Sequence, residues 1–125
     1  LKKLKVCLLS RCRKLTTISV CAALTFCKEL ESIHITNLTD DIYLEKALSV
    51  LAEPCILKTL IADGCIITDL AMQIVAATMP HLQFLHLNTS NTSVRDADID
   101  LVARNCPGIT SLEMTHFKSI GNPRI

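Results

Sequence analysis

Cysteine is the residue type in this sequence that could most readily bind a metal or act as a nucleophile. The seven cysteines are Cys7, Cys12, Cys21, Cys27, Cys55, Cys65 and Cys106. Seven is an odd number, so the cysteines cannot all pair as disulfides within the chain. No C-x-x-C pair is present, and the four histidines do not fall at zinc-finger spacing. We therefore predict no metal site.

Most of the cysteines occupy apolar positions of the sequence. This favours small buried thiols in a reducing compartment, the cytoplasm or the nucleus. Three N-x-S/T triplets, which begin at Asn37, Asn88 and Asn91, point instead to secretion. Such triplets arise by chance in a Thr-rich sequence, so the cysteines carry more weight. No run of 18 uncharged apolar residues occurs, so no transmembrane helix and no membrane partner are expected.

Other catalytic motifs are missing from the sequence. The three glycines, Gly64, Gly108 and Gly121, are isolated, so no glycine-rich phosphate loop is present. No serine or cysteine lies in a nucleophile motif. These observations predict a protein that is not an enzyme and that carries no cofactor.

The composition predicts an aliphatic core. Half of the 125 residues are hydrophobic, which excludes global disorder, but only three phenylalanines and one tyrosine are present. The net charge is +1, so the molecule as a whole is not attracted to nucleic acid or membrane.

An L-x-x-L-x-L pattern recurs five times, with starts separated by 26, 27, 25 and 27 residues. It predicts strands near residues 4–9, 30–35, 57–62, 82–87 and 109–114. Between the strands lie apolar sets at the helical spacing i, i+3, i+4, i+7. These sets are Val20-Ala23-Leu24-Cys27, Ala47-Val50-Leu51-Pro54, Met72-Val75-Ala76-Met79 and Ile99-Val102-Ala103-Cys106. Each unit is therefore expected to be a strand, a turn and a helix.

The helix boundaries carry their own signals. Thr68-Asp69 is a start signal, and Asp40-Asp41 and Asp96 place negative charge where two other helices should begin. Pro54, Pro80 and Pro107 follow the ends of the predicted helices.

A single strand-and-helix unit cannot bury its apolar face alone, whereas stacked units share a continuous core. The sequence therefore predicts an α/β right-handed solenoid over residues 1–125, with parallel strands on the concave side and helices on the convex side. Neither end of the chain has a polar capping unit, which predicts a fragment of a longer array or a covering partner.

Two copies of the repeat carry a recognisable motif. The segment from Ile67 to Leu82 reads ITDLAMQIVAATMPHL, and the next copy, from Val94 to Ile109, keeps Asp96, Val102-Ala103 and Cys106-Pro107. This pattern resembles the cysteine-containing leucine-rich repeat, which has an I-T-D start, then L-x-x-L-A and C-P-x-L. Cys12 and Cys65 match its cysteine at the strand end. Three repeats depart from the pattern at the strand end, where Leu38, Ser90 and Phe117 replace the cysteine, and Met79 replaces the cysteine before Pro80.

The same repeat subtype is found in F-box leucine-rich-repeat proteins. The resemblance implies a protein-binding scaffold, the substrate-recognition part of an F-box-type (SCF) ubiquitin ligase. No F-box lies within these residues, so a Skp-type adaptor would bind through a segment outside this chain. The alternative is a structural leucine-rich-repeat subunit of a large cytoskeletal or ribonucleoprotein assembly.

Alternate strand residues should point away from the core, onto the concave surface. They form three rows: Val6, Ser32, Thr59, Phe84 and Ser111; Leu8, His34, Ile61, His86 and Glu113; Ser10, Thr36, Asp63, Asn88 and Thr115. From these rows we predict a protein-binding site. Its members are Leu8, His34, Ile61, Asp63, Phe84, His86, Asn88 and Glu113.

Two features of this predicted site bear on its chemistry. Leu8, Ile61 and Phe84 form a modest apolar strip that either contacts a protein ligand or reflects ordinary surface exposure. His86 and Glu113 should form a surface pair, and no accompanying nucleophile or oxyanion donor makes them a catalytic dyad. His34 and His86 lie two strands apart, about 10 Å, too far to share one metal.

Positive charge is concentrated at the N-terminus. Residues 1–30 contain seven basic residues and one acidic residue, whereas the rest contain six and eleven. The predicted basic edge is Lys2, Lys3, Lys5, Arg11, Arg13 and Lys14. Such an edge suits an acidic partner or a phosphate backbone, although a solvated edge is the simpler interpretation. No aromatic residues are interleaved for base stacking, so nucleic acid is not an expected partner.

Overall fold

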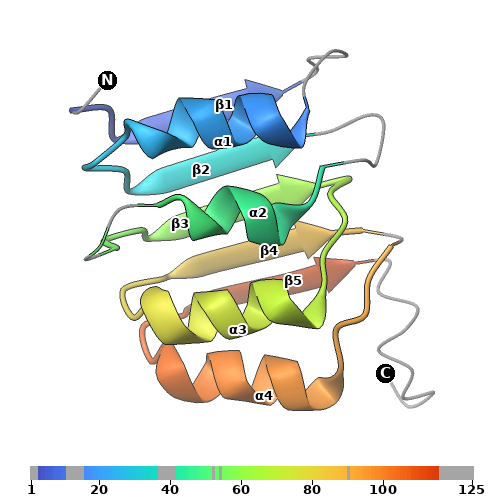
Figure 1. Ribbon diagram of the computed structural model, residues 1–125. Coiled ribbons are helices and arrows are strands. Elements are labelled where there is room, and N and C mark those ends of the chain that lie inside the picture. Colours follow the sequence, from blue (N-terminus) through green and yellow to red (C-terminus); the bar gives the residue numbers. More distant parts are fainter. Residues whose placement is uncertain are drawn as a thin grey trace.

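The computed structural model describes residues 3–10, 16–36, 42–51, 53, 55–89 and 91–115 of the chain. Within these residues, five strands alternate with four helices (Figure 1). The order is β1 (Val6–Ser10), α1 (Thr17–Thr25), β2 (Ser32–Thr36), α2 (Leu44–Ser49), β3 (Thr59–Asp63), α3 (Asp69–Thr78), β4 (Phe84–Asn88), α4 (Asp96–Asn105) and β5 (Ser111–Thr115). The strands form one sheet in the order β1-β2-β3-β4-β5, and every neighbouring pair is parallel. The predicted α/β class and the parallel strands are confirmed.

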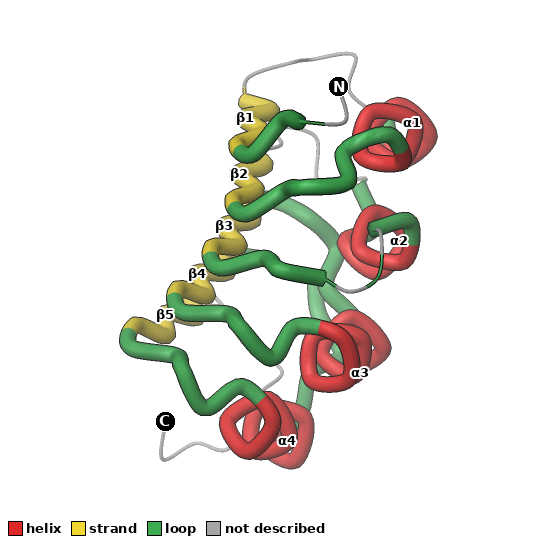
Figure 2. The backbone as a smooth tube through the Cα atoms, turned by 90° about the vertical axis from the view of Figure 1, so that its left-hand side faces the viewer, coloured by secondary structure: helices red, strands yellow, loops and turns green. Residues whose placement is uncertain are grey.

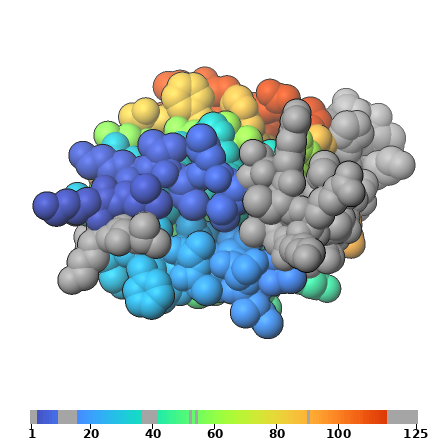
Figure 3. Space-filling model, turned by 90° about the horizontal axis from the view of Figure 1, so that it is seen from above, coloured from blue at the N-terminus to red at the C-terminus, as the bar shows by residue number. Residues whose placement is uncertain are grey.

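The helices and the strands occupy two layers. Figure 2 shows all four helices on one side of the sheet, and each helix packs against the next one along the chain. No described helix covers the other side, which we call the open face. Figure 3 looks onto the β1 end of the stack, where the blue side chains of β1 and α1 lie at the surface.

The strands begin two residues later than the sequence predicts. The first leucine of each repeat lies in the turn before the strand, where Leu30, Leu57 and Leu82 are buried. These leucines therefore fill the core beneath the turn, and the sheet begins only after them.

A repeated pair of backbone hydrogen bonds joins successive units. The carbonyl oxygen of Lys5, just before β1, accepts from the backbone N–H groups of Glu31 and Ser32 at 2.8 and 3.0 Å. The carbonyl oxygens at the three equivalent positions of the following units do the same. The Glu31 carbonyl oxygen accepts from Lys58 and Thr59, that of Lys58 accepts from Gln83 and Phe84, and that of Gln83 accepts from Thr110 and Ser111. All four interfaces between units are thus built alike.

The core lies between the sheet and the helices. Two rows of strand residues face it: Cys7, Ile33, Leu60, Leu85 and Leu112, and Leu9, Ile35, Ala62, Leu87 and Met114. The buried helix residues opposite them include Val20, Leu24, Leu44, Ala47, Leu48, Met72, Val75, Ala76 and Val102. The core is aliphatic, as the composition predicts, because no aromatic side chain is among the buried residues described.

Two helical predictions need correction. Helix α2 ends at Ser49, so Val50 and Leu51, which were assigned to its buried face, lie beyond it and are half-buried. Pro54 falls outside the described residues. Ala103 of α4 is exposed rather than buried, because α4 packs against α3 alone among the described helices.

The predicted helix starts have clear structural roles. Thr68 caps α3, where its side-chain oxygen accepts from the backbone N–H of Ala71 at 3.4 Å. Its hydroxyl also donates to Glu45 Oε1 at 2.7 Å and so joins α3 to α2. Helix α4 begins at Asp96, and the backbone N–H of Arg95 before it donates to Asp98 Oδ2 at 3.0 Å. Asp40-Asp41 lies outside the described residues.

Among the described helices, none combines the length and the apolar character needed to cross a lipid bilayer.

Candidate functional site

The register of the sheet confirms the three predicted rows on the open face. Leu8 lies beside His34, then Ile61, His86 and Glu113, each on the next strand. The rows on either side run from Val6 to Ser111 and from Thr36 to Thr115, as predicted, whereas the side chain of Ser10 lies outside the described part of the structure.

A depression of about 210 Å³ opens at the carboxyl ends of β3, β4 and β5. It is lined by Ile61, Ala62, Asp63, His86, Leu87, Asn88, Glu113 and Thr115. Five of the eight predicted site residues are therefore brought together here. Leu8, His34 and Phe84 lie elsewhere on the open face, and we refer to this depression as the β3–β5 depression.

Hydrogen bonds fix the polar side chains of the depression. Asn88 Nδ2 donates to Asp63 Oδ1 at 2.8 Å, between neighbouring strands. Gly64, which follows Asp63, has a φ of 81° that favours glycine, and its backbone N–H donates to the Asn88 carbonyl oxygen at 2.8 Å. The β3–β4 pair therefore holds the Asp63 carboxylate in a defined position.

The imidazole of His86 lies between two partners on β5. Its Nε2 is 2.8 Å from the hydroxyl oxygen of Ser111, and its Nδ1 is 3.9 Å from Glu113 Oε2. The predicted pairing of His86 with Glu113 is confirmed as a contact at the edge of the ion-pair range. Sequence reasoning placed Ser111 on the open face but gave it no role, because its contact with His86 depends on side-chain orientation.

The exposed apolar residues do not form one strip. Leu8 is 63% exposed on β1, whereas Ile61 and Phe84 lie on β3 and β4, with His34 of β2 between them and Leu8. Val6 on β1 is also exposed, so apolar surface gathers at two places on the open face. The Phe84 ring packs edge-on against His86 with the ring centroids 6.4 Å apart, so Phe84 contacts a lining residue of the depression without lining it.

Only part of the predicted basic edge lies within the described residues. Lys3 and Lys5 are exposed, and Lys5 Nζ is 4.0 Å from Glu31 Oε2. Lys58 Nζ is 3.5 Å from the other oxygen of the same carboxylate. The charge of Lys5 is therefore partly balanced. Lys2, Arg11, Arg13 and Lys14 lie outside the described residues.

The described cysteines remain thiols and mostly serve the core. Cys7, Cys27, Cys65 and Cys106 are buried, Cys21 and Cys55 are half-buried, and Cys12 lies outside the described residues. Burial raises the pKa of Cys7, Cys55 and Cys106, which disfavours the thiolate needed for nucleophilic attack. The Cys106 thiol donates to the Met79 carbonyl oxygen at 3.2 Å, and so joins two units. Among the residues that the structure covers, no three His, Cys, Asp or Glu side chains are grouped to hold a metal.

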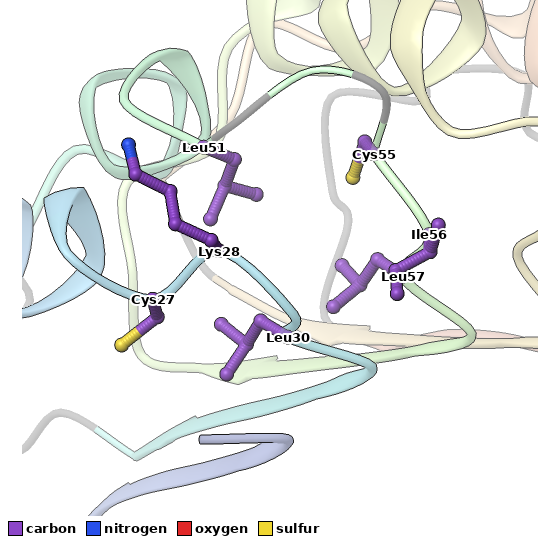
Figure 4. Close-up of a pocket in the computed structure, with 7 residues that line it drawn as sticks. All are labelled: Cys27, Lys28, Leu30, Leu51, Cys55, Ile56 and Leu57. Atoms are coloured by element: carbon purple, nitrogen blue, oxygen red, sulfur yellow. The ribbon is translucent and has the colours of Figure 1, made fainter. Parts of the chain in front are cut away.

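A second pocket lies between the end of α1 and the segment before β3 (Figure 4). Its lining is Cys27, Lys28, Leu30, Leu51, Cys55, Ile56 and Leu57. Its volume of about 10 Å³ is close to the minimum for a single water molecule. This pocket is therefore a packing gap between two units and cannot admit a ligand.

The raised thiol pKa values predict a loss of stability at alkaline pH. The unfolded chain releases these protons at lower pH than the folded chain. The stabilisation that the buried thiols give to the folded state is therefore complete below about pH 8.5. It is lost as the pH rises through the higher folded-state pKa values. Urea unfolding midpoints measured from neutral pH upward should fall. In a variant with Cys7, Cys55 and Cys106 changed to alanine, the urea midpoints should fall less over the same pH range. The same dependence of the midpoint on pH in both proteins would contradict the prediction.

Comparison with known proteins finds no family model that matches the chain and no match among curated proteins.

Proposed function

We propose that the chain is a leucine-rich-repeat scaffold that binds a protein ligand on the open face of its sheet. A right-handed solenoid is supported by three features of the described residues. Five parallel strands form one layer, four helices form the other, and the same backbone hydrogen bonds occur at each of the four interfaces between units. The open face would be its concave side and the helices its convex side. The proposed protein is not an enzyme and works in the cytoplasm or the nucleus.

The observation that carries this proposal is the side-chain composition of the open face. Its middle row contains aliphatic, imidazole and carboxylate groups on successive strands, and no described helix covers them. Protein interfaces combine apolar anchors with polar groups in this way. Folding alone does not require this mixture of aliphatic, imidazole and carboxylate side chains on a surface that faces solvent.

The resemblance to F-box leucine-rich-repeat proteins gives the proposal its finer form, the substrate-recognition part of a ubiquitin ligase. The motif residues have structural roles that suit such a repeat. Thr68 caps a helix, Cys65 is buried two residues after the end of β3, and Cys106 is buried just before Pro107. A Skp-type adaptor would bind through a segment outside this chain. Adaptor recovery with the full-length protein tests this form, and it fails if no adaptor is recovered and no F-box is encoded.

A structural role in a cytoskeletal or ribonucleoprotein assembly is the second candidate. The exposed Lys3 and Lys5 favour it, because they belong to the basic end of the chain. Partner binding through phosphate groups should weaken steeply as the salt concentration rises. A flat response between low and moderate salt would exclude a phosphate contact.

Two exposed phenylalanines on opposite layers test the open face directly. Phe84 on β4 is 41% exposed, and Phe26 at the end of α1 is 63% exposed. With a purified protein ligand of the full-length chain, Phe84→Ala should weaken binding about tenfold or more, as expected for an aromatic interface anchor. Phe26→Ala should leave the affinity unchanged. Loss of binding with Phe26→Ala alone would assign the interface to the helices instead.

A further inference from the structure

The β3–β5 depression has a charge character that the rest of the open face lacks. Two of its lining side chains are carboxylates, Asp63 on β3 and Glu113 on β5, and none is lysine or arginine. The described lysine and arginine side chains that form ion pairs do so elsewhere: Lys5 and Lys58 with Glu31, and Arg95 and Arg104 on the helix layer. Among the described residues, the depression therefore holds two carboxylates and no lysine or arginine, and its one imidazole, that of His86, lies beside Glu113.

The acceptor geometry of Asp63 suits a planar donor. Asn88 occupies one site on Oδ1, and a carboxylate offers about four acceptor sites over its two oxygens. The carboxylate is half-buried on a rigid sheet and is oriented by its neighbour, so little conformational entropy is lost when a donor binds. Glu113 adds a second negative charge two strands away, about 10 Å across the sheet.

The remaining walls suit an aliphatic stem. Ile61 is half-buried beside Asp63 on the same strand, and His86 presents an aromatic ring held by Ser111. Arginine buries its methylene stem against apolar groups, stacks on aromatic faces and pairs with carboxylates in a bidentate manner. The volume of about 210 Å³ lies below that of sites for drug-sized ligands, which fits one side chain rather than a small-molecule cofactor.

We propose that the β3–β5 depression is a subsite for an arginine side chain of the protein ligand, with Asp63 as its principal partner. This inference rests on the proposed function, because it assigns the chemistry of one part of the open face. Charge complementarity and the mixed lining of the depression carry it.

A short probe peptide tests the subsite without knowledge of the ligand. Acetyl-Gly-Arg-Gly-amide is titrated into the ¹⁵N-labelled chain at millimolar concentrations, and the amide resonances are followed by NMR. The matched peptide has citrulline in place of arginine, which keeps the shape and removes the charge. We expect the arginine peptide to shift the amides of Asp63, Asn88 and Glu113, and the citrulline peptide to leave them nearly unchanged.

Three variants of equal charge change locate the site. Asp63→Asn keeps an oxygen that can accept from Asn88 and should weaken peptide binding about tenfold or more. Glu113→Gln should weaken it severalfold. Asp100→Asn removes a carboxylate of the α4 surface pair with Arg104 and should have no effect. The spectra themselves report whether each variant is folded.

The outcomes separate this inference from the proposed function. Equal binding of the citrulline peptide, equal loss with Asp100→Asn, or no shift at the lining amides would overturn the arginine subsite. If Phe84→Ala weakens binding of the protein ligand and Asp63→Asn does not, the scaffold stands and the subsite falls. If neither change matters, both fall.

Discussion

Replacement of Leu60 by aspartate is expected to unfold the third repeat and its neighbours. Leu60 is fully buried in the middle strand, with Ile33 and Leu85 beside it. The change removes a buried aliphatic group and places an unpaired carboxylate in the core, at a cost above about 4 kcal/mol. A single domain is stable by only about 5–15 kcal/mol, so the variant should lose its cooperative thermal transition in circular dichroism.

The neighbouring residue provides the control for this prediction. Thr59 lies on the open face of the same strand, so Thr59→Asp adds the same charge one residue away. Its carboxylate remains hydrated, and the spectrum and melting temperature should be nearly those of the original chain. Equal damage from the two substitutions would contradict the assignment of inward and outward positions.

Truncation of Leu85 should cost several times more than truncation of Leu112. The two leucines hold the same place in the repeat and pair across β4 and β5, but Leu85 is fully buried and Leu112 is 45% exposed. Leu85→Ala leaves a cavity between two flanking units and should lower the free energy of unfolding by about 2–5 kcal/mol. Leu112→Ala removes a side chain that has a neighbouring strand on one side only among the described strands, and it should lower the free energy of unfolding by about 1 kcal/mol.

Urea denaturation of both variants measures this difference. The comparison holds the residue type and the motif position constant, so it isolates the contribution of the neighbouring unit. Equal losses of unfolding free energy in the two variants would show that a neighbouring unit does not help to bury the leucines of a strand. That result would contradict a core shared between units.

The repeat made the strands and their rows predictable from sequence. Each motif supplies the same inward and outward residues, so alignment of the copies gives neighbours such as Leu8 and His34 without any coordinates. The two-residue displacement of the strands was not predicted, because a leucine buried in a turn and one buried in a strand look alike in a sequence. Helix α2 shows the same limit, since Val50 and Leu51 keep the helical spacing but follow its last residue.

The candidate site could be predicted only as rows. The β3–β5 depression depends on the way side chains lean, and in particular on the bond from Asn88 to Asp63 and the contact of Ser111 with His86. Such contacts follow from rotamers, which strand alternation does not determine. The separation of the apolar strip into two patches, by contrast, is visible in the predicted middle row, because His34 lies between Leu8 and Ile61.

Interstrand nuclear Overhauser effects report on whether the five strands pair in parallel and in the order of the repeats. We expect contacts between backbone protons of Ile33 and Leu60, and of Leu60 and Leu85, in a parallel pattern that links each repeat only to the next. Antiparallel contacts, or contacts between repeats that are not consecutive, would contradict both the shared core and the open face built upon it.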